Sequence, residues 1–252
     1  MTTQRTGLGQ EKLLIAETLS EALPFMRRFN GSTFVIKFGG HAMGDDKLAD
    51  LFAQDVVLLK HVGINPVVIH GGGPQIGAML ERLRIKSSFV DGLRVTDKET
   101  VKVVEEVLSK EINKKIVDDI NATGGKAIGL SGNKNNLIQA KKLSIEIKDS
   151  DSNIEKILDL GFVGEPTNIE ISIINDTIAN GLIPVIAPLG IDNDGNTYNI
   201  NADTVAGAIA GAMKANKLLL LTDVAGILDQ NDKLISSLFI KEAKKIINEK
   251  FI

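Results

Sequence analysis

Two glycine-rich segments, each directly after an apolar run, are the parts of this sequence best suited to binding an anion. Lys37–Gly40 follows the run Thr33–Ile36, and His70–Pro74 follows the run Pro66–Ile69. Glycines let backbone N–H groups approach a phosphate or carboxylate closely, and a proline at a helix start leaves those groups at the positive helix end. A lysine at a strand end adds a point charge suited to phosphate. The alternative is a pair of ordinary strand-to-helix turns.

Three further segments carry polar side chains that could contact a ligand. Asp91–Thr96 contains Arg94, whose guanidinium can clamp a carboxylate bidentately. Tyr198–Asp203 ends with an acid at a predicted helix start, which is also favourable on dipole grounds alone. Thr222–Leu228 follows another apolar run and could contact a nucleotide or merely turn the chain.

Other ligand-binding motifs match less well. Gly71 and Gly73 fit the start of a dinucleotide fingerprint, with Asp91 about twenty residues on, but Ile76 stands where the third glycine is required. A P-loop of the Walker type is absent. Asp192–Asp203 has acids spaced as in a calcium loop, but its glycine is at the wrong position.

The amino-acid composition is typical of a globular protein and excludes several kinds of binding or catalytic site. The chain has 252 residues, 43% of them apolar and 24% charged, with a net charge of −3. That size favours one large domain or two lobes, and the mixed charges exclude a chain-wide basic surface for nucleic acid. Without cysteine there is no disulfide, thiolate metal site or cysteine nucleophile. The three histidines lack metal-ligand spacing, so no metal site is predicted.

Nothing in the sequence indicates a membrane or a secretory signal. The first ten residues are polar, and apolar runs such as Leu218–Leu221 are far shorter than the roughly 20 residues that span a bilayer. We therefore expect a cytoplasmic protein.

Apolar runs and amphipathic segments alternate along the chain. Strands are predicted at Thr33–Ile36, Pro66–Ile69, Lys126–Leu130, Ile183–Ala187 and Lys217–Leu221. Helices are predicted at Lys12–Phe29, Lys47–His61, Pro74–Leu83, Thr96–Ala122, Asn168–Asn180, Ala202–Met213 and Ile240–Glu249. This order predicts an α/β fold with a mainly parallel open sheet and helices on both faces. In such sheets ligands bind beyond the carboxyl ends of the strands, where the glycine-rich segments fall.

Several local features are also predicted. Pro24 should kink or break the first helix, and Thr96–Glu99 should form a capping box. Gly181 should end a helix as its C′ residue. Asn136–Ile147 alternates weakly and predicts an antiparallel hairpin, followed by a polar turn at Ser150–Asn153.

Taken in order, the polar segments resemble the amino-acid kinase superfamily and, within it, the acetylglutamate kinases, over about residues 10–252. The segments that carry the resemblance are Val35–Gly40, Val68–Pro74, Gly92–Thr96, Asn199–Asp203 and Thr222–Ile227. The resemblance implies an α/β/α sandwich preceded by an N-terminal helix. It also implies transfer of the γ-phosphoryl group of ATP to the side-chain carboxylate of N-acetyl-L-glutamate, the second step of arginine biosynthesis.

The resemblance assigns roles around ATP. Lys37 stabilises charge on the transferring phosphoryl group, and Asp203 orients lysines instead of acting as a base. Gly39 and Gly40 supply nearby amide donors. The ATP-contacting loop corresponds to Asp223, Val224, Ala225, Gly226, Ile227 and Leu228. Mg²⁺ would arrive with ATP, held largely by phosphates and water.

The resemblance also assigns the second substrate. Gly72 and Gly73 hold the end of acetylglutamate that is phosphorylated. Arg94 and Asn199 bind its amino-acid end, Arg94 through a carboxylate. Since a carboxylate nucleophile is already ionised at pH 7, catalysis would consist of positioning and electrostatics.

The resemblance divides the chain into residues 1–30, an N-terminal oligomerisation helix; 31–190, an acetylglutamate-binding lobe; and 191–252, an incomplete ATP-binding lobe. It implies a homo-oligomer, either a dimer or a hexamer joined through that helix. It further implies about forty more residues, with a second catalytic lysine in a Gly-Gly-Met-Ile-Pro-Lys-like stretch that no lysine of this chain matches.

Two other functions stay open on the sequence. The chain could bind acetylglutamate and oligomerise without catalysis, or it could be a different amino-acid kinase, such as a glutamate 5-kinase. Calorimetry beside turnover, and a panel of substrates, would separate these possibilities.

Overall fold

The computed structural model describes residues 3–148 and 155–248. Within these ranges no helix combines the length and apolarity needed to cross a membrane. The polar turn predicted at Ser150–Asn153 lies outside the described residues.

A five-stranded sheet forms the centre of the molecule. Its strands are β1 (Thr33–Phe38), β2 (Asn65–His70), β5 (Ala127–Ser131), β8 (Ile183–Ala187) and β11 (Lys217–Leu220). They lie in the order β11-β1-β2-β8-β5, and every neighbouring pair is parallel. The predicted parallel sheet is therefore confirmed. β11 lies beside β1, and the division into two lobes stays a prediction.

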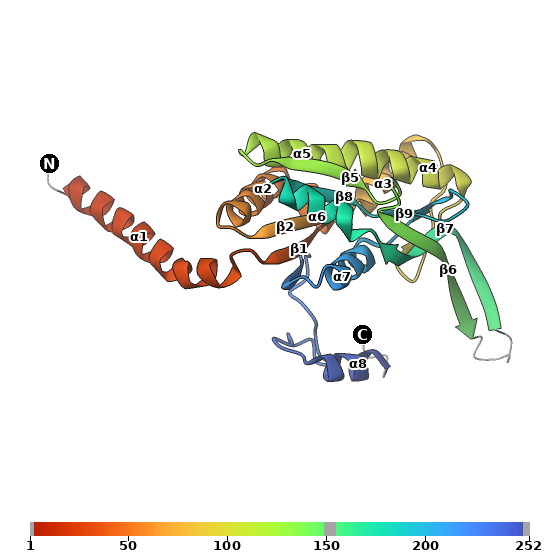
Figure 1. Cartoon of the computed structure of the whole chain (residues 1–252). Helices are drawn as coiled ribbons and strands as arrows, with labels where there is room; N and C mark the ends of the chain where they lie inside the picture. Colours follow the sequence, from red (N-terminus) through yellow and green to blue (C-terminus); the bar gives the residue numbers. More distant parts are fainter. Residues whose placement is uncertain (1–2, 149–154, 249–252) are drawn as a thin grey trace.

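Helices cover both faces of this sheet (Figure 1). α2 (Asp46–His61), α3 (Gly73–Arg82) and a long helix before β5 pack on one face, while α6 (Ile171–Ala179) and α7 (Ala202–Ala212) pack on the other. Alternate residues of one strand serve the two cores. In β1, Phe34, Ile36 and Phe38 join the first core, whereas Val35 joins the second.

The register of β1 and β2 brings the two glycine-rich segments together. Phe38 pairs with His70, the last residue of each strand. The N–H of Gly71 then donates to the carbonyl of Phe38 at 2.8 Å. Because parallel strands end at the same edge, both glycine segments lie beside each other above the sheet.

A small closed barrel adjoins the sheet. It consists of β6 (Ile138–Lys148), β7 (Glu155–Ile169), β9 (Leu189–Ile191) and β10 (Thr197–Asn199). β6 and β7 pair antiparallel. The hairpin predicted at Asn136–Ile147 is wrong in extent, because that segment forms only the first strand, β6, and its partner is β7. The helix predicted from residue 168 begins later, at Ile171, because β7 continues to Ile169 and the side chain of Glu170 caps the helix by accepting from Ser172 N–H.

The predicted helix 96–122 is one continuous rod with three parts. These are α4 (Lys98–Glu106), a π-helical segment η2 (Val107–Ile112) and α5 (Asn113–Ala122). The capping box at Thr96 is wrong by one residue: Asp97 is the N-cap and accepts from the N–H groups of Glu99 and Thr100. Thr96 is fully buried, and its hydroxyl donates to the carbonyl of Arg94 instead.

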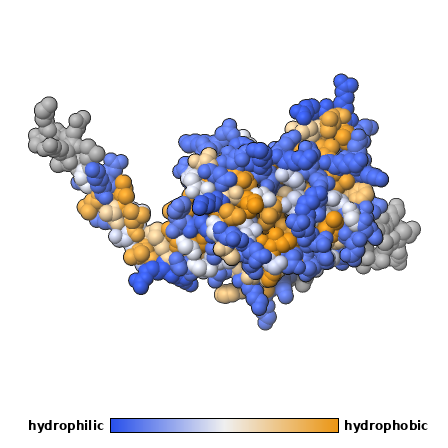
Figure 2. All heavy atoms as spheres, turned by 45° about the horizontal axis from the view of Figure 1, so that its top comes forward, coloured by the Kyte–Doolittle hydropathy of each residue, from blue (hydrophilic) through white to orange (hydrophobic). Residues whose placement is uncertain are grey.

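The ends of the described chain lie apart from the sheet. α1 (Thr3–Phe29) projects from the body as an exposed helix carrying apolar patches (Figures 1 and 2), and α8 (Ile240–Asn248) follows the loop after β11. A break at Pro24 does not occur. The neighbouring turn is solvent-exposed, so the carbonyl of Ser20 that loses its partner can bond to water. Gly181 follows α6 with φ of 76°, as predicted for a C′ glycine.

A short hairpin completes the fold. It is formed by β3 (Phe89–Val90) and β4 (Leu93–Arg94), which pair antiparallel between α3 and the long helix. Asp91 and Gly92 join the two strands, both with positive φ. The hairpin places Arg94 beside the glycine segment that opens α3.

Candidate active site

A cavity of about 220 Å³ lies beyond the carboxyl ends of β1 and β2. It is lined by residues from segments that are far apart in the sequence. Eight of the predicted site residues line it, namely Lys37, Gly39, Gly40, Gly72, Gly73, Arg94, Asn199 and Asp203. The structure therefore brings together both glycine segments, both predicted catalytic side chains and the predicted substrate-binding pair.

Lys37 and Asp203 form an ion pair at one end of this group. Lys37 Nζ lies 3.1 Å from Asp203 Oδ1, with the lysine side chain 15% exposed and the carboxylate 50% exposed. A Cβ at Gly39 would lie 3.0 Å from Lys37 Cε and Nζ, so glycine leaves room for the lysine to fold over the loop. Since the carboxylate is half-exposed, the pair contributes chiefly to orienting the ammonium group.

The N-terminus of α7 positions Asp203. Asn201 caps this helix by accepting from the N–H groups of Asp203 and Thr204, at 2.9 and 3.0 Å. Asp203 thus lies in the first helical turn, where the helix dipole favours its negative charge.

Gly72 and Gly73 also line this cavity. A Cβ at Gly72 would lie 2.6 Å from both Ile112 Cδ1 and Leu108 Cδ2, so only glycine fits against the π-helical segment. Gly73 has no neighbouring atom within 4 Å of a Cβ position. No side chain caps α3, which begins at Gly73 with Pro74 in its first turn. Its first N–H groups are therefore oriented to bind an anion.

Arg94 is a buried cation held at a defined position. Its Nη2 donates to the carbonyl of Gly73 at 2.9 Å, and its Nη1 donates to the Ser87 hydroxyl. The guanidinium also lies 4.5 Å from the centre of the Phe89 ring. Burial lowers the pKa of Arg94, though arginine stays protonated. Among the described residues no carboxylate forms an ion pair with it, so its charge is available to an acidic ligand.

Asn199, the last residue of β10, also lines the cavity. Its Nδ2 donates to Thr96 Oγ1 at 3.4 Å, and that hydroxyl donates in turn to the carbonyl of Arg94. The two predicted substrate-binding residues are thus joined through Thr96, although more than a hundred positions separate them in sequence.

The segment Asp223–Leu228 does not line this cavity. Asp223 lies next to Gly40, since a Cβ there would be 3.8 Å from the Asp223 carboxyl carbon. Val224, Ile227 and Leu228 are exposed. The contact of this segment with ATP stays a prediction.

Sequence reasoning missed the apolar residues of the cavity. Phe89 and Leu93 belong to the short hairpin, and Leu108 belongs to the π-helical segment. Two-residue strands give no periodic signal, so the hairpin was not predictable. Leu108 lies within the predicted helix Thr96–Ala122, where it reads as an ordinary core residue.

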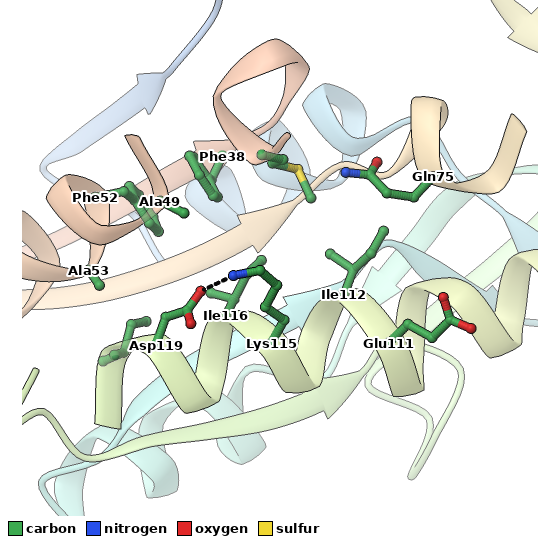
Figure 3. A pocket seen from close by; sticks show the side chains of 12 residues that line it. Phe38, Ala49, Phe52, Ala53, Gln75, Glu111, Ile112, Lys115, Ile116 and Asp119 are labelled. Carbon is green, nitrogen blue, oxygen red and sulfur yellow. Dashed lines mark hydrogen bonds and ion pairs between the residues drawn. The ribbon is translucent and has the colours of Figure 1, made fainter. Parts of the chain in front are cut away.

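A second cavity, of about 230 Å³, lies between α2 and α5 (Figure 3). Phe38 and Phe52 stack along one side with ring centres 3.9 Å apart, and Lys115 pairs with Asp119 at 3.0 Å along the other. Ile112 borders it and also contacts Gly72, so this cavity lies behind the loop of the first one. Gln75 also lines this cavity, and its Oε1 is buried and has no hydrogen-bond partner within the described residues.

Metal-binding side chains are not grouped in the described part of the chain. No set of three or more histidine, aspartate or glutamate residues there could hold a metal ion.

The family profile and the most similar curated proteins point to the same family. The profile of the amino acid kinase family matches residues 32–252. An acetylglutamate kinase of Rhodospirillum centenum is 59% identical over 240 residues, covering 95% of this chain and 79% of the relative. One from Rhodospirillum rubrum is 60% identical over 234 residues, covering 93% and 76%.

Solved structures share the fold. A Streptococcus mutans protein superposes with a TM-score of 0.73 at 29% identity, over 87% of this chain and 84% of its own. N-acetylglutamate synthase from Neisseria gonorrhoeae, complexed with coenzyme A and N-acetyl-glutamate, gives a TM-score of 0.76 at 22% identity. That match covers 92% of this chain and 51% of the synthase, and it supports the fold alone.

Proposed function

This chain belongs to the amino acid kinase family and, within it, to the acetylglutamate kinases, and on that premise we infer how its own residues perform the reaction. The reaction transfers the γ-phosphoryl group of ATP to the side-chain carboxylate of N-acetyl-L-glutamate. The product is N-acetyl-L-glutamyl 5-phosphate, an intermediate of arginine biosynthesis. The observation that carries this inference is the single cavity that joins Lys37, both glycine segments and Arg94.

Arg94 would hold the α-carboxylate of acetylglutamate. Its guanidinium is fixed by Gly73, Ser87 and Phe89 and has no carboxylate partner among the described residues. Asn199 lines the same cavity and would bind the same end of the substrate. Because Arg94 also bonds to Gly73, the site that recognises the substrate is tied to the loop that holds its reacting end.

The reacting carboxylate would lie against Gly72 and Gly73, at the uncapped start of α3. It is ionised at neutral pH, so it attacks phosphorus without a general base. The bond from phosphorus to the bridging oxygen of ADP breaks as the new bond to the carboxylate oxygen forms. N–H donors and the helix dipole reduce the repulsion between the carboxylate and the phosphoryl oxygens.

Lys37 would stabilise the charge on the transferring group, with Asp203 holding its ammonium in place. Gly39 and Gly40 would supply amide donors to the phosphates of ATP, and Asp223–Leu228 would contact the nucleotide. Mg²⁺ would enter as MgATP, held mainly by phosphate oxygens and water. Cytoplasmic location and assembly as a homo-oligomer through α1 remain predictions.

The direct test is ATP-dependent formation of acyl phosphate, trapped with hydroxylamine, with calorimetry of both ligands in parallel. We expect acetylglutamate to react in preference to glutamate, aspartate and carbamate. Lys37→Ala should lower kcat by about 100-fold or more, the scale of a lost transition-state charge contact, with little effect on acetylglutamate affinity. Lys47→Ala, on an exposed part of α2, is the matched control.

Each alternative gives a distinct result. Binding of acetylglutamate without turnover would support a non-catalytic chain and contradict the proposal. Preference for free glutamate would indicate a glutamate 5-kinase. Full activity of Lys37→Ala would refute the role of that lysine.

A further inference from the structure

His70 is the one fully buried titratable group next to the proposed site among the described residues, and the reaction above does not use it. It is the last residue of β2 and directly precedes the Gly71–Gly73 loop. Its exposed fraction is zero, and it does not line the cavity. Burying a polar ring at this position is favourable only if both ring nitrogens find partners.

Both nitrogens do find partners. Nδ1 lies 2.8 Å from the carbonyl oxygen of Gly71, and Nε2 lies 3.2 Å from Asn113 Nδ2. A carbonyl can only accept, so Nδ1 carries the hydrogen and Nε2 accepts from the asparagine. Asn113 Nδ2 also donates to the carbonyl of Val185 at 2.9 Å, so both of its hydrogens are used. Desolvation lowers the pKa of His70 to about 4, which keeps this neutral tautomer near pH 7.

Asn113, the hydrogen-bond partner of His70, is also held in a defined position. Asn113 is 4% exposed, and a Cβ at Gly129 would lie 2.0 Å from its Oδ1. The missing side chain on β5 therefore makes the space in which the asparagine sits. Asn113 follows η2 directly, and the same segment packs Leu108 and Ile112 against Gly72. The π-helical turn thus contacts the loop at two points.

The planar peptide bond between Gly71 and Gly72 links the direction of the Gly71 carbonyl to that of the Gly72 N–H. The carbonyl of Gly71 and the N–H of Gly72 belong to one planar trans peptide, and the structure contains no cis bond. They point in opposite directions. Holding the Gly71 oxygen toward the buried ring therefore turns the Gly72 N–H away from it, on the side where Gly72 lines the cavity.

We propose that His70 and Asn113 are positioning residues that hold the Gly71–Gly73 loop with its N–H donors directed at the reacting carboxylate of the substrate. The inference rests on the proposed function for the identity of that carboxylate. Neither residue touches substrate or exchanges a proton with it. Their contribution is to restrict the backbone conformations of Gly71–Gly73 before the substrate binds, so that less conformational entropy is lost on binding.

Two substitutions of His70 separate its two hydrogen bonds. His70→Asn keeps an N–H donor at the position of Nδ1 and loses the contact to Asn113. His70→Gln reaches Asn113 and loses the donor to Gly71. We expect His70→Gln to weaken acetylglutamate binding at least tenfold by calorimetry, and His70→Asn to weaken it less than threefold. Asn113→Leu should fall between the two variants.

In each variant, the affinity for a nucleotide is compared with the affinity for acetylglutamate. The Kd of the non-hydrolysable ATP analogue AMP-PNP should change less than twofold in all three. Ile174→Ala, which removes a fully buried side chain from the other face of the sheet, controls for general loss of stability. It should leave both affinities unchanged.

Amide hydrogen exchange of residues 71–73 in the ligand-free protein tests the same inference without a substrate. We expect exchange there to be at least fivefold faster in His70→Gln and Asn113→Leu, and unchanged in Ile174→Ala. Equal effects of His70→Asn and His70→Gln on affinity, or unchanged loop exchange, would overturn the proposal. If wild type fails to bind acetylglutamate while loop exchange responds as expected, the proposed function fails and the positioning role stands.

Discussion

At the scale of single residues, the site depends on two cations, Lys37 and Arg94, whose positions are set by neighbouring groups. Arg94 shows this best, because three contacts of different kinds fix one guanidinium. The planar guanidinium has five N–H donors, so it can donate to Gly73 and Ser87 and still offer N–H groups to a carboxylate, whereas an ammonium has three donors on one nitrogen.

Arg94→Lys should therefore weaken acetylglutamate binding although the charge is kept. We expect the Kd to rise about 10- to 100-fold, since a charge-assisted hydrogen bond contributes about 1.5–3 kcal/mol. Arg82→Lys, on an exposed part of α3, should leave affinity unchanged. Calorimetry on both variants measures the difference, and equal affinities would remove Arg94 from the substrate site.

His70 also gives stability a pH dependence of known sign. Its pKa falls from 6.5 to about 4 in the folded chain, so the unfolded chain binds a proton that the folded chain does not. The stabilisation is complete above pH 6.5 and is lost as pH falls toward 4, by about 3 kcal/mol in all.

His70→Asn should therefore lose less free energy of unfolding between pH 7 and pH 4.5 than wild type does. Urea unfolding at both pH values measures this loss in each protein. Carboxylates contribute equally to the two proteins, so a parallel decline in both would contradict the assignment.

At the scale of elements, helix ends carry much of the positioning. Asp97 starts the long helix by accepting hydrogen bonds from Glu99 N–H at 3.1 Å and Thr100 N–H at 2.7 Å. These bonds also lower the pKa of its carboxyl group. The cap fixes where the helix begins, and hence where its π-helical turn meets Gly72.

Asp97→Ala should lower the free energy of unfolding by about 1 kcal/mol, the usual cost of losing an N-cap. Lys102→Ala, on the exposed face of the same helix, should change it by less than about 0.5 kcal/mol. Chemical denaturation compares the two. A loss in Asp97→Ala no larger than in Lys102→Ala would show that another group caps the helix.

At the scale of the whole molecule, the cavity exists only because the sheet, the barrel and the hairpin meet. Its lining comes from β1, β4, β10 and the start of α7, none of which is complete as a site alone. A ligand that bridges these parts binds the folded chain and not the unfolded one.

Acetylglutamate at about 100 times its Kd should therefore raise the free energy of unfolding by about 2.7 kcal/mol. Thermal unfolding with and without the ligand measures this, and Arg94→Lys at the same concentration should show a smaller rise. The absence of any shift in wild type would mean that the cavity does not bind this acid.

Local patterns were enough to predict the parallel sheet and the glycine segments at its edge, whereas the group of residues around them was predicted from the family resemblance. Apolar runs of four or five residues that alternate with amphipathic segments are typical of buried parallel strands. Parallel strands end at one edge, so the order of the motifs alone brought Lys37 near Gly72. The N-cap at Asp97 was missed because threonine and aspartate are both good caps, and burial of Thr96 decided between them.

The sequence by itself determined the strands, the turns and the glycine-rich segments, because these follow from local pattern. Through the family resemblance, the ordered motifs also indicated which residues share one site, and those residues line one cavity. Only the tertiary structure decided what holds them there. The network from His70 through Asn113 to Val185 spans three elements, and no spacing rule connects positions so far apart. The π-helical turn also has no signal in sequence, and it carries Leu108 and Ile112, the two side chains that lie against Gly72.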